Sequence, residues 1–366
     1  MNDEYYMRKA LNLARRGLGK TRPNPMVGAL IVRDGEIIGQ GYHRRYGGDH
    51  AEIIATRDAK GDMSGATLYV TLEPCCHQGK KTPPCLDALL KYNLERVVIG
   101  TVDPNPQVNG KSIEVLRERG VETKVGVLSE ECYRLNEVYF KYIQTGIPFV
   151  TLKFAQTLDG RIASTTGDSR WISSEPSLKL AHRLRSFHDA VLVGVGTVLR
   201  DDPQLTVRQV KGRNPIRIVT DSRLRIPLNS KILGDQEIAP TIIATTSQAD
   251  RGKSSALMQM GIEILMVGED KEGEVDLEDL LKKLGQRDFS SILVEGGATL
   301  ITSLIRQELA DRFIVILAPK IMGKGIDAVG DLGISDVERA LKLSLVKTYR
   351  SGEDLVIEAR PEVDRG

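Results

Sequence analysis

The sequence predicts an α/β protein made of two domains. Segments with apolar residues at helical spacing alternate with apolar segments of strand length along the chain. The 366 residues exceed a usual single domain, because about 150 residues per domain is typical. The alternation is interrupted at Gln144-Thr-Gly-Ile-Pro148. We therefore expect one domain over 1–145 and a second over 146–366.

The first half begins with an amphipathic helix, since Tyr6, Ala10 and Leu13 recur at helical spacing before Gly17. A β-hairpin follows, with its turn at Asp34-Gly35 between two apolar segments. The next predicted elements are helices at 50–59 and 84–91, strands at 67–71 and 96–100, and further alternation over 112–143. This order indicates a three-layer α/β domain.

The second half opens with a strand at 149–153, which would end at Lys153. Further strands are predicted at 190–194, 215–220, 241–246, 262–267, 291–294 and 312–317, and helices at 174–187, 276–285 and 298–308. The strand segments are apolar almost throughout, which is typical of strands covered on both faces. The second domain is therefore also expected to be α/β.

Charge and hydropathy exclude several classes of function. Lys and Arg number 51 against 49 Asp and Glu, and the two signs are interspersed, so no basic stripe indicates nucleic-acid binding. No apolar run approaches the roughly 20 residues of a membrane span, and the first residues lack the pattern of a signal peptide. We expect a cytoplasmic protein that binds neither nucleic acid nor membrane; a phosphate-bearing small molecule remains compatible.

Three of the four cysteines, Cys75, Cys76 and Cys85, lie in one short segment, which favours a metal or catalytic site over disulfides. Together with His50, two cysteines could hold Zn²⁺ at three corners of a tetrahedron and leave the fourth for water. Zinc lowers the pKa of such a water to about 7. In the His-x-Glu and Pro-Cys signature of zinc deaminases the Glu, here Glu52, is the general acid/base and not a ligand.

The same residues allow other interpretations. An isolated His-Ala-Glu would more often be a helix cap beside a structural cysteine pair. Cys75 is preferred to Cys76 as a ligand because it directly follows proline; His77 is a further possible ligand, and Cys132 is expected in the core.

Two glycine turns in the second half indicate nucleotide binding. Gly194-Val-Gly196 and Glu295-Gly-Gly297 each follow a predicted strand, and the second precedes a helix. Glycines there allow backbone amides to approach a phosphate at a helix N-terminus. The third glycine of the dinucleotide fingerprint is missing, so a standard Rossmann site is not predicted. Arg223, beside Ser222 at a strand end, could meet a 2′-phosphate or belong to a charged loop.

Nine residues separate Cys75 from Cys85, more than the Cys-x-x-Cys of cytidine and transfer-RNA deaminases. Further motifs in the first half are Thr21-Arg-Pro-Asn-Pro-Met-Val-Gly28, Gly41-Tyr-His43, His50-Ala-Glu52 and Thr71-Leu-Glu-Pro-Cys75. Those in the second half are Leu158-Asp-Gly160, Trp171-Ile-Ser173, Gly196-Thr-Val198, Asp201-Asp-Pro203, Leu205-Thr-Val-Arg208 and Val294-Glu-Gly-Gly-Ala-Thr-Leu300. With these motifs the chain resembles, over essentially its full length, the bifunctional riboflavin-biosynthesis deaminase/reductase (RibD, or RibG) family.

The resemblance implies a cytidine-deaminase-like three-layer domain followed by a dihydrofolate-reductase-like α/β domain. It also implies zinc-dependent hydrolytic deamination of 2,5-diamino-6-ribosylamino-4(3H)-pyrimidinone 5′-phosphate. NADPH-dependent reduction of the ribosyl group to 5-amino-6-ribitylaminouracil 5′-phosphate would follow. One zinc ion per deaminase domain, NADPH, a small-molecule substrate and a homo-oligomer are the implied cofactors and partners.

Site residues follow from the same resemblance. In the first domain Asn24, His43 and one of Lys80 or Lys81 would contact substrate; the family has a single basic residue at this point. In the second domain the cofactor would meet Ala155, Trp171, Thr197, Asp201, Ser222, Gly297, Ala298, Thr299, Leu300, Ile301, Thr302 and Ser303. The substrate would meet Ser169, Arg185, Leu205, Arg208 and Glu295, with Lys153 as a further candidate.

Taken singly, several of these residues have ordinary explanations. Asn24 could be a turn residue, and His43 a satisfied polar residue on the hairpin. Trp171 could belong to the core, Lys153 could be an edge lysine, and the two arginines could be surface charges.

Two other functions compete with the implied one. A nucleic-acid deaminase whose second half grips RNA would need a basic, aromatic-rich surface, which balanced charge and 5% aromatic residues do not favour. A non-catalytic, zinc-stabilised regulatory protein would have no need for Glu52.

Overall fold

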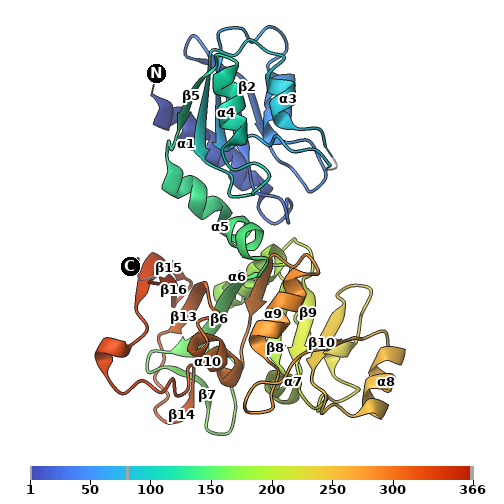
Figure 1. Ribbon diagram of the computed structural model, residues 1–366. Helices are drawn as coiled ribbons and strands as arrows, with labels where there is room; N and C mark the ends of the chain where they lie inside the picture. Colours follow the sequence, from blue (N-terminus) through green and yellow to red (C-terminus); the bar gives the residue numbers. More distant parts are fainter. Residues whose placement is uncertain (1, 80–81, 363–366) are drawn as a thin grey trace. The chain divides into compact units, whose positions relative to one another are not determined.

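The computed structural model describes residues 2–79 and 82–362 (Figure 1). Lys80 and Lys81, one of which was expected at the substrate, lie outside the described residues. The chain divides into two compact units, Met1–Gly146 and Ile147–Gly366. Among the described residues no helix combines the length and the apolar character that crossing a membrane requires.

The first unit is built on a five-stranded sheet in the order β2-β1-β3-β4-β5. Its strands are β1 (Gly28–Arg33), β2 (Glu36–Tyr42), β3 (Thr67–Leu72), β4 (Arg96–Thr101) and β5 (Glu122–Val125). Strand β1 pairs antiparallel with β2 and β3, whereas β3, β4 and β5 run parallel. The helices are α1 (Asp3–Ala14), α2 (Ala51–Asp58), α3 (Cys85–Leu89), α4 (Lys111–Glu118) and α5 (Ser129–Thr145).

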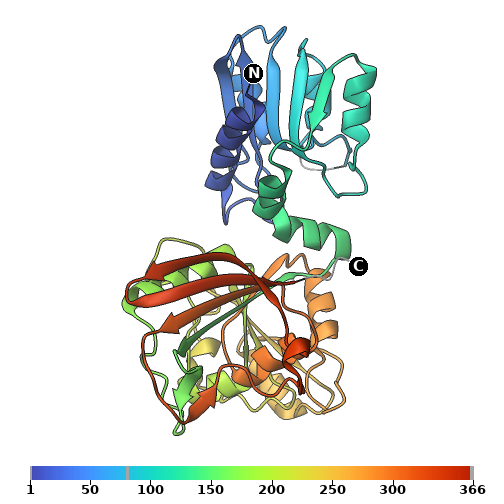
Figure 2. The ribbon, with the colours of Figure 1, turned by 90° about the vertical axis from the view of Figure 1, so that its left-hand side faces the viewer.

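Alternate residues of these strands enter two separate cores, because successive side chains point to opposite faces of a sheet. Ile31 and Val70 pack with helices α2, α3 and α4 on one face. Leu30 and Tyr69 pack with α1 and with Cys132 of α5 on the other. The predicted three-layer domain is confirmed, and so is the expectation that Cys132 belongs to the core (Figure 2).

One glycine brings α2 close to the sheet. A Cβ atom on Gly41 of β2 would lie 2.3 Å from the carbonyl oxygen of Ala51 at the start of α2. Any side chain there would displace the helix whose first residues carry His50 and Glu52. Gly41 therefore helps to place these two residues over the sheet.

The second unit contains a nine-stranded sheet in the order β11-β10-β9-β8-β12-β6-β13-β16-β15. Seven strands run parallel: β6 (Phe149–Thr157), β8 (Ala190–Gly194), β9 (Ile216–Thr220), β10 (Thr241–Thr245), β11 (Glu263–Met266), β12 (Ser291–Val294) and β13 (Arg312–Ala318). The hairpin of β15 (Leu343–Ser351) and β16 (Asp354–Pro361) extends one edge by antiparallel pairing. A separate ribbon pairs β7 (Arg161–Ser164) with β14 (Gly325–Asp327).

Helices cover both faces of this sheet, as the apolar strands predicted. The helices are α6 (Glu175–Phe187), α7 (Val195–Asp201), α8 (Arg251–Gln259), α9 (Leu277–Gly285) and α10 (Ala298–Arg306). Helices α9 and α10 share a core with one face. Helices α7 and α8 pack on the other. The α/β class predicted for the second half is thus confirmed.

The structure corrects the prediction at several places. Strand β6 continues to Thr157, so Lys153 lies inside a strand between β12 and β13 and not at a strand end or sheet edge. Helices α7 and α8 and strands β7, β14, β15 and β16 were not predicted. Helix α7 contains Gly196, a weak helix former. Strand β15 is largely exposed, so its sequence lacks the apolar pattern of a core strand.

Candidate metal centre and nucleotide cleft

Three side chains from distant parts of the first unit meet in one place. His50 is the residue that precedes α2, Cys75 follows β3, and Cys85 is the first residue of α3. One ligand atom from each lies within 4.8 Å of the other two. The Nδ1 atom of His50 is 3.4 Å from Cys75 Sγ and 3.2 Å from Cys85 Sγ.

These distances fit a zinc ion. Zn–S bonds of about 2.3 Å and Zn–N bonds of about 2.0–2.1 Å at tetrahedral angles place sulfur and nitrogen about 3.5 Å apart. The backbone N–H of Cys85 points to Cys75 Sγ at 3.3 Å, as suits a thiolate ligand. The other ring nitrogen of His50 lies 3.3 Å from the hydroxyl of Thr82, which can fix the ring's orientation.

Glu52 lies beside this group, two residues after His50 on α2, and is 3% exposed. Its Oε2 atom is buried and has no hydrogen-bond partner among the described residues. Burial raises the pKa of the Glu52 carboxyl, and the charge of Cys75 acts in the same direction. A buried carboxyl oxygen without a partner needs an explanation, and a water or ligand group beside the metal ligands would provide one.

Asn24 and His43 lie at the same centre. The Nδ2 atom of Asn24 donates to Nε2 of His43 at 3.2 Å, and His43 Nδ1 is 3.0 Å from the carbonyl oxygen of Asp49. This arrangement corresponds to a neutral His43 with its proton on Nδ1. Burial lowers the pKa of His43, which agrees with the neutral form. Its ring stands nearly perpendicular to that of His50, with centroids 5.3 Å apart.

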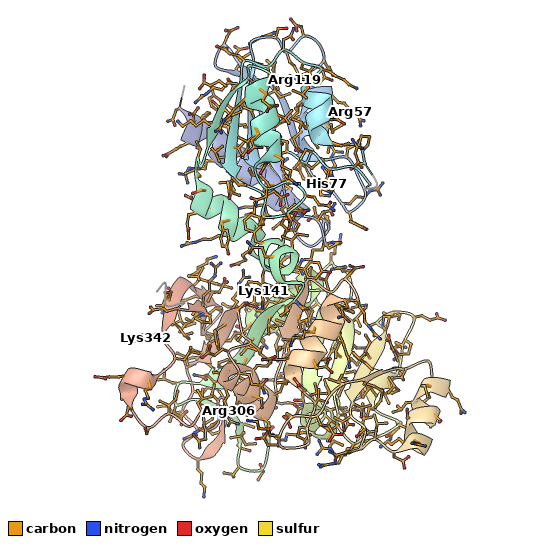
Figure 3. The ribbon with its side chains drawn as sticks, in the orientation of Figure 1. Arg57, His77, Arg119, Lys141, Arg306 and Lys342 are labelled. Atoms are coloured by element: carbon orange, nitrogen blue, oxygen red, sulfur yellow. The ribbon has the colours of Figure 1, made fainter. Side chains whose placement is uncertain are left out.

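Cys76 and His77 lie outside the group of three ligands. Cys76 is partly buried and packs against the core beside α2 to α4, with Sγ 3.7 Å from the carbonyl oxygen of Gln107. His77, labelled in Figure 3, is not part of the ligand group. Glu73 accepts hydrogen bonds from Ser112 Oγ at 2.7 Å and from the Gly110 N–H at 2.9 Å, so it holds the start of α4.

Thr82 and Asp103 were not predicted as site residues, although Thr82 belongs to the Thr-Pro-Pro-Cys motif that ends at Cys85. Asp103 is 5% exposed, and burial raises its pKa to about 6, although hydrogen bonds from the Asn105 N–H and the Tyr139 hydroxyl act in the opposite direction. Asp103 follows β4 at the carboxyl end of a parallel strand, where ligand sites of α/β folds commonly lie. This position at a strand end and the Asp103-Pro-Asn-Pro106 motif could have identified Asp103 as a candidate site residue.

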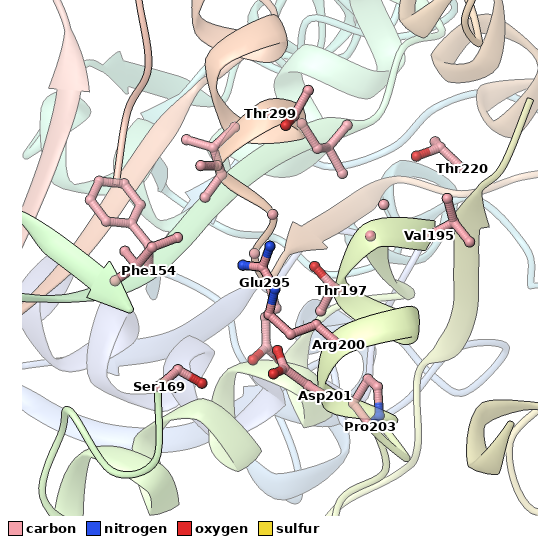
Figure 4. A pocket seen from close by; sticks show the side chains of 18 of the residues that line it. Phe154, Ser169, Val195, Thr197, Arg200, Asp201, Pro203, Thr220, Glu295 and Thr299 are labelled. Atoms are coloured by element: carbon pink, nitrogen blue, oxygen red, sulfur yellow. The ribbon is translucent and has the colours of Figure 1, made fainter. Parts of the chain in front are cut away.

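The second unit holds a cleft of about 1140 Å³ at the carboxyl ends of its parallel strands. Figure 4 shows Thr197, Asp201 and Glu295 among the side chains that line it. The predicted residues that line it are Lys153, Ala155, Ser169, Trp171, Arg185, Thr197, Asp201, Leu205, Arg208, Ser222, Glu295, Gly297, Ala298, Thr299, Leu300, Ile301 and Ser303. Thr302 is not among the lining residues that the structure describes; its Oγ1 donates to Ala298 O and accepts the Gly330 N–H.

A cluster of buried charges forms one wall of the cleft. Nε and Nη2 of Arg185 donate to Glu295 Oε1 and Oε2 at 2.5 and 3.0 Å. Lys153 Nζ is 3.8 Å from Glu295 Oε2. Burial by itself would raise the pKa of Glu295, but Arg185 and Lys153 hold it below its ordinary value. Burial lowers the pKa of Lys153.

Arg208 lies near this cluster. Its Nη1 donates to Thr206 Oγ1 at 2.6 Å and its backbone N–H to His182 Nδ1 at 3.2 Å. Burial, together with the charge of Arg185, lowers the pKa of Arg208. Arg185 and Arg208 both line the cleft. Arg185 is largely buried beside Glu295, whereas the side chain of Arg208 is exposed.

Of the two predicted glycine turns, the second lies where it was expected, whereas Gly194 ends β8 and Gly196 belongs to helix α7. Gly296 and Gly297 have φ values of 100° and 80° just before α10, and a Cβ on Gly297 would come within 3.2 Å of Thr197 Oγ1. The positive φ values and this close approach both favour glycine. Trp171 is 66% exposed, so the alternative that it is a core residue is wrong.

Arg223 does not occupy the predicted position. It is half exposed, donates to Gln248 Oε1 at 3.0 Å, and is absent from the described lining of the cleft. Arg225 and Lys231 are among the cations that line the cleft. Ser222 lines the cleft and donates its hydroxyl proton to Glu274 at 2.6 Å.

Comparison with known proteins assigns both units. Residues 1–101 match the family model described as the cytidine and deoxycytidylate deaminase zinc-binding region. Residues 148–357 match the RibD C-terminal domain. Each match contains the site found in its unit.

Relatives match the chain over nearly its whole length. It is 47% identical to the riboflavin biosynthesis protein RibD of Aquifex aeolicus, with 97% of each chain covered. It is 42% identical to the protein of that name from Escherichia coli, with 93% of each covered. A Thermotoga maritima crystal structure described as a diaminohydroxyphosphoribosylaminopyrimidine deaminase/5-amino-6-(5-phosphoribosylamino)uracil reductase superposes with a TM-score of 0.84 at 40% identity over 98% of each chain.

Proposed function

This chain belongs to the RibD family of riboflavin biosynthesis, and on that premise we propose that it is a bifunctional deaminase and reductase. Residues 1–145 would deaminate 2,5-diamino-6-ribosylamino-4(3H)-pyrimidinone 5′-phosphate. Residues 146–366 would reduce the product to 5-amino-6-ribitylaminouracil 5′-phosphate with NADPH. The observation that carries the deaminase assignment is Glu52 Oε2, which is buried beside the ligand group of His50, Cys75 and Cys85 and has no hydrogen-bond partner in the described part of the chain.

In the deaminase, His50, Cys75 and Cys85 hold the zinc ion. When bound, zinc polarises water for hydrolysis. Glu52 would accept a proton from the attacking water and return it to the departing amine, so that a ring C–O bond forms, the C–N bond breaks and ammonia leaves. Asn24 and His43 bind the pyrimidine beside this centre.

In the reductase, Arg185 and Arg208 bind the sugar phosphate, for which guanidinium groups are well suited. The turn before α10, together with Thr197, receives the phosphates of the dinucleotide. When bound, NADPH supplies the hydride that reduces the anomeric carbon of the opened ribosyl group. Lys153, held beside Glu295, polarises the sugar and delivers the proton that balances this reduction.

The test uses purified, zinc-loaded protein and the diaminopyrimidine ribosyl phosphate. Without NADPH, we expect ammonia release and accumulation of the deaminated nucleotide. Folded, zinc-loaded protein that releases no ammonia would contradict the proposal. Tight RNA binding with a steep salt dependence would favour the nucleic-acid deaminase instead.

We also propose a homo-oligomer that works on small molecules in the cytoplasm. Strand β15 ends the sheet, pairs with β16 within the described chain, and exposes Leu345 (68%) and Val346 (38%). Such an edge can pair with a second copy. Cys75, Cys76, Cys85 and Cys132 are thiols and not disulfides in the described part of the chain, and thiols are kept reduced in the cytosol, which supports the cytoplasm. Light scattering on the wild type and on Leu345→Lys tests the assembly. We expect the mass of an oligomer for the wild type and a smaller mass for the variant. The mass of a monomer for both proteins would contradict the proposal.

A further inference from the structure

Helix α5 is interrupted by a buried asparagine. Asn136 has φ −115° and ψ 16° within the helix and is 2% exposed. Asparagine is a poor residue for a helix interior, because its side chain competes for backbone hydrogen bonds. A buried asparagine at an irregular helical position therefore calls for a specific partner.

That partner is the backbone of a single residue 110 positions away. Asn136 Oδ1 accepts the N–H of Met26 at 2.8 Å, and Asn136 Nδ2 donates to the carbonyl oxygen of Met26 at 2.8 Å. One side-chain amide thus satisfies both polar groups of one peptide residue, as a neighbouring β-strand would. The position of Met26 relative to α5 is fixed by two bonds rather than one.

Met26 lies in the segment that carries the groups beside the metal ligands. Asn24 is two residues before it, and Val27 directly after it accepts the His43 N–H at 2.9 Å. The Asn24 side chain in turn donates to the His43 ring at 3.2 Å. The segment 24–27 is therefore held between α5 on one side and His43 on the other.

We propose that Asn136 is a positioning residue of the deamination site. It binds the Met26 backbone and thereby sets the direction of Asn24 and the His43 ring, without touching the substrate. This inference rests on the proposed function, because it takes Asn24 and His43 to bind the pyrimidine. An apolar side chain of similar size would fill the space but leave both Met26 groups without partners.

The test is Asn136→Ala in the full-length, zinc-loaded enzyme. We expect KM for deamination to rise about tenfold, the effect of losing about 1.4 kcal/mol of interaction, with a smaller change in kcat. Zinc content and the reductase rate on deaminated substrate should stay within about twofold of the wild type. Arg134→Ala is the matched control, because Arg134 lies on the same helix with its side chain 53% exposed.

A double-mutant cycle separates positioning from general packing. If Asn136 acts through Asn24, the KM effects of Asn136→Ala and Asn24→Ala must be strongly non-additive. Additive effects, an unchanged KM, or equal loss of the reductase activity would each overturn the proposal. If the alanine variant does not fold, Asn136→Asp keeps the acceptor for the Met26 N–H and loses the donor, and the same cycle applies.

A readout without substrate distinguishes this proposal from the proposed function. Hydrogen exchange of the Met26 amide should be faster in Asn136→Ala than in the wild type and in Arg134→Ala. Unchanged exchange would contradict the role of Asn136 in holding the Met26 backbone. If the Met26 amide of the wild type exchanges slowly but the protein releases no ammonia, the proposed function is contradicted and the Asn136–Met26 interaction is not.

Discussion

His50 and Cys85 are 35 residues apart in the sequence, yet Nδ1 of one lies 3.2 Å from Sγ of the other. Each occupies the start of a helix, α2 or α3, on the same face of the sheet. Both helix starts pack on this face, so ligands that are distant in the sequence meet in one group. The centre is therefore organised by the fold of the first unit.

Replacing Glu52 by Gln should reduce ammonia release by at least about 100-fold, since a positioned general acid/base contributes about 10² to 10⁴. Zinc content and the reductase activity on deaminated substrate should be unchanged, because the ligands and the second unit are intact. The exposed Glu114→Gln variant is the control. Normal ammonia release by Glu52→Gln would remove Glu52 from the proposed mechanism.

Replacing Cys85 by Ser should weaken zinc binding by more than about 100-fold, because loss of a ligand exceeds the effect of losing an outer-shell partner. Bound zinc is measured after dialysis against a chelator of known affinity. Cys76→Ser serves as the matched control and should retain its zinc, since Cys76 lies outside the ligand group. The opposite result, zinc lost from Cys76→Ser and kept by Cys85→Ser, would show that the ligand set is wrong.

Replacing Glu295 by Gln leaves Arg185 and Lys153 without their carboxylate. Breaking a buried ion pair costs about 3–5 kcal/mol, and the open cleft should limit the loss in unfolding free energy to about 1–3 kcal/mol. NADPH oxidation should fall, while ammonia release continues at the wild-type rate. Urea titration measures the unfolding free energy, and assays of NADPH oxidation and ammonia release measure the two activities. The variant Glu353→Gln, at an exposed position, is the control. Equal stability and full reductase activity would contradict the role assigned to the cluster.

Asp3 is expected to make the unfolding free energy of the first unit depend on pH in the acidic range. It accepts hydrogen bonds from Arg96, Lys124 and Tyr69. Burial acts to raise its pKa, but these bonds lower it to about 2. A carboxyl whose pKa is lower in the folded state stabilises the fold above its unfolded pKa of about 4, and this contribution is lost as the pH falls from about 4 to 2.

The variant Asp3→Asn should therefore be less stable than the wild type at pH 7, by about 1–2 kcal/mol, and the difference should shrink as the pH approaches 2. Chemical denaturation at several pH values measures it. Glu4→Gln, an exposed change on the same helix, should show no such dependence. A difference that stays constant from pH 7 to 2 would contradict the assignment to Asp3.

Sequence reasoning succeeded where local pattern and burial agree. The hairpin of β1 and β2 has a clear turn at Asp34-Gly35, and the apolar runs of β8, β9, β10 and β12 are buried on both faces. The motifs that carry chemistry were also informative. The predicted ligands His50, Cys75 and Cys85 meet at one centre. Most residues implied for cofactor and substrate in the second unit line one cleft, whereas Thr302 and Arg223 are absent from its described lining.

The positions that the sequence did not predict correctly have physical explanations. Lys153 looked like the end of a strand because a charged residue follows an apolar run, yet its charge is accommodated inside the sheet by Glu295. Asn136 carries no local signal, since its importance comes from a backbone 110 residues away. Thr82 and Asp103 likewise depend on which loops the sheet brings together.

We expect one chain to perform both reactions in succession. The most direct measurement follows ammonia release and NADPH oxidation together in a single reaction with zinc-loaded protein, NADPH and the diaminopyrimidine ribosyl phosphate. We expect equal final amounts of ammonia and oxidised NADPH, with ammonia appearing first. Ammonia without NADPH oxidation, or neither from folded and zinc-loaded protein, would contradict it.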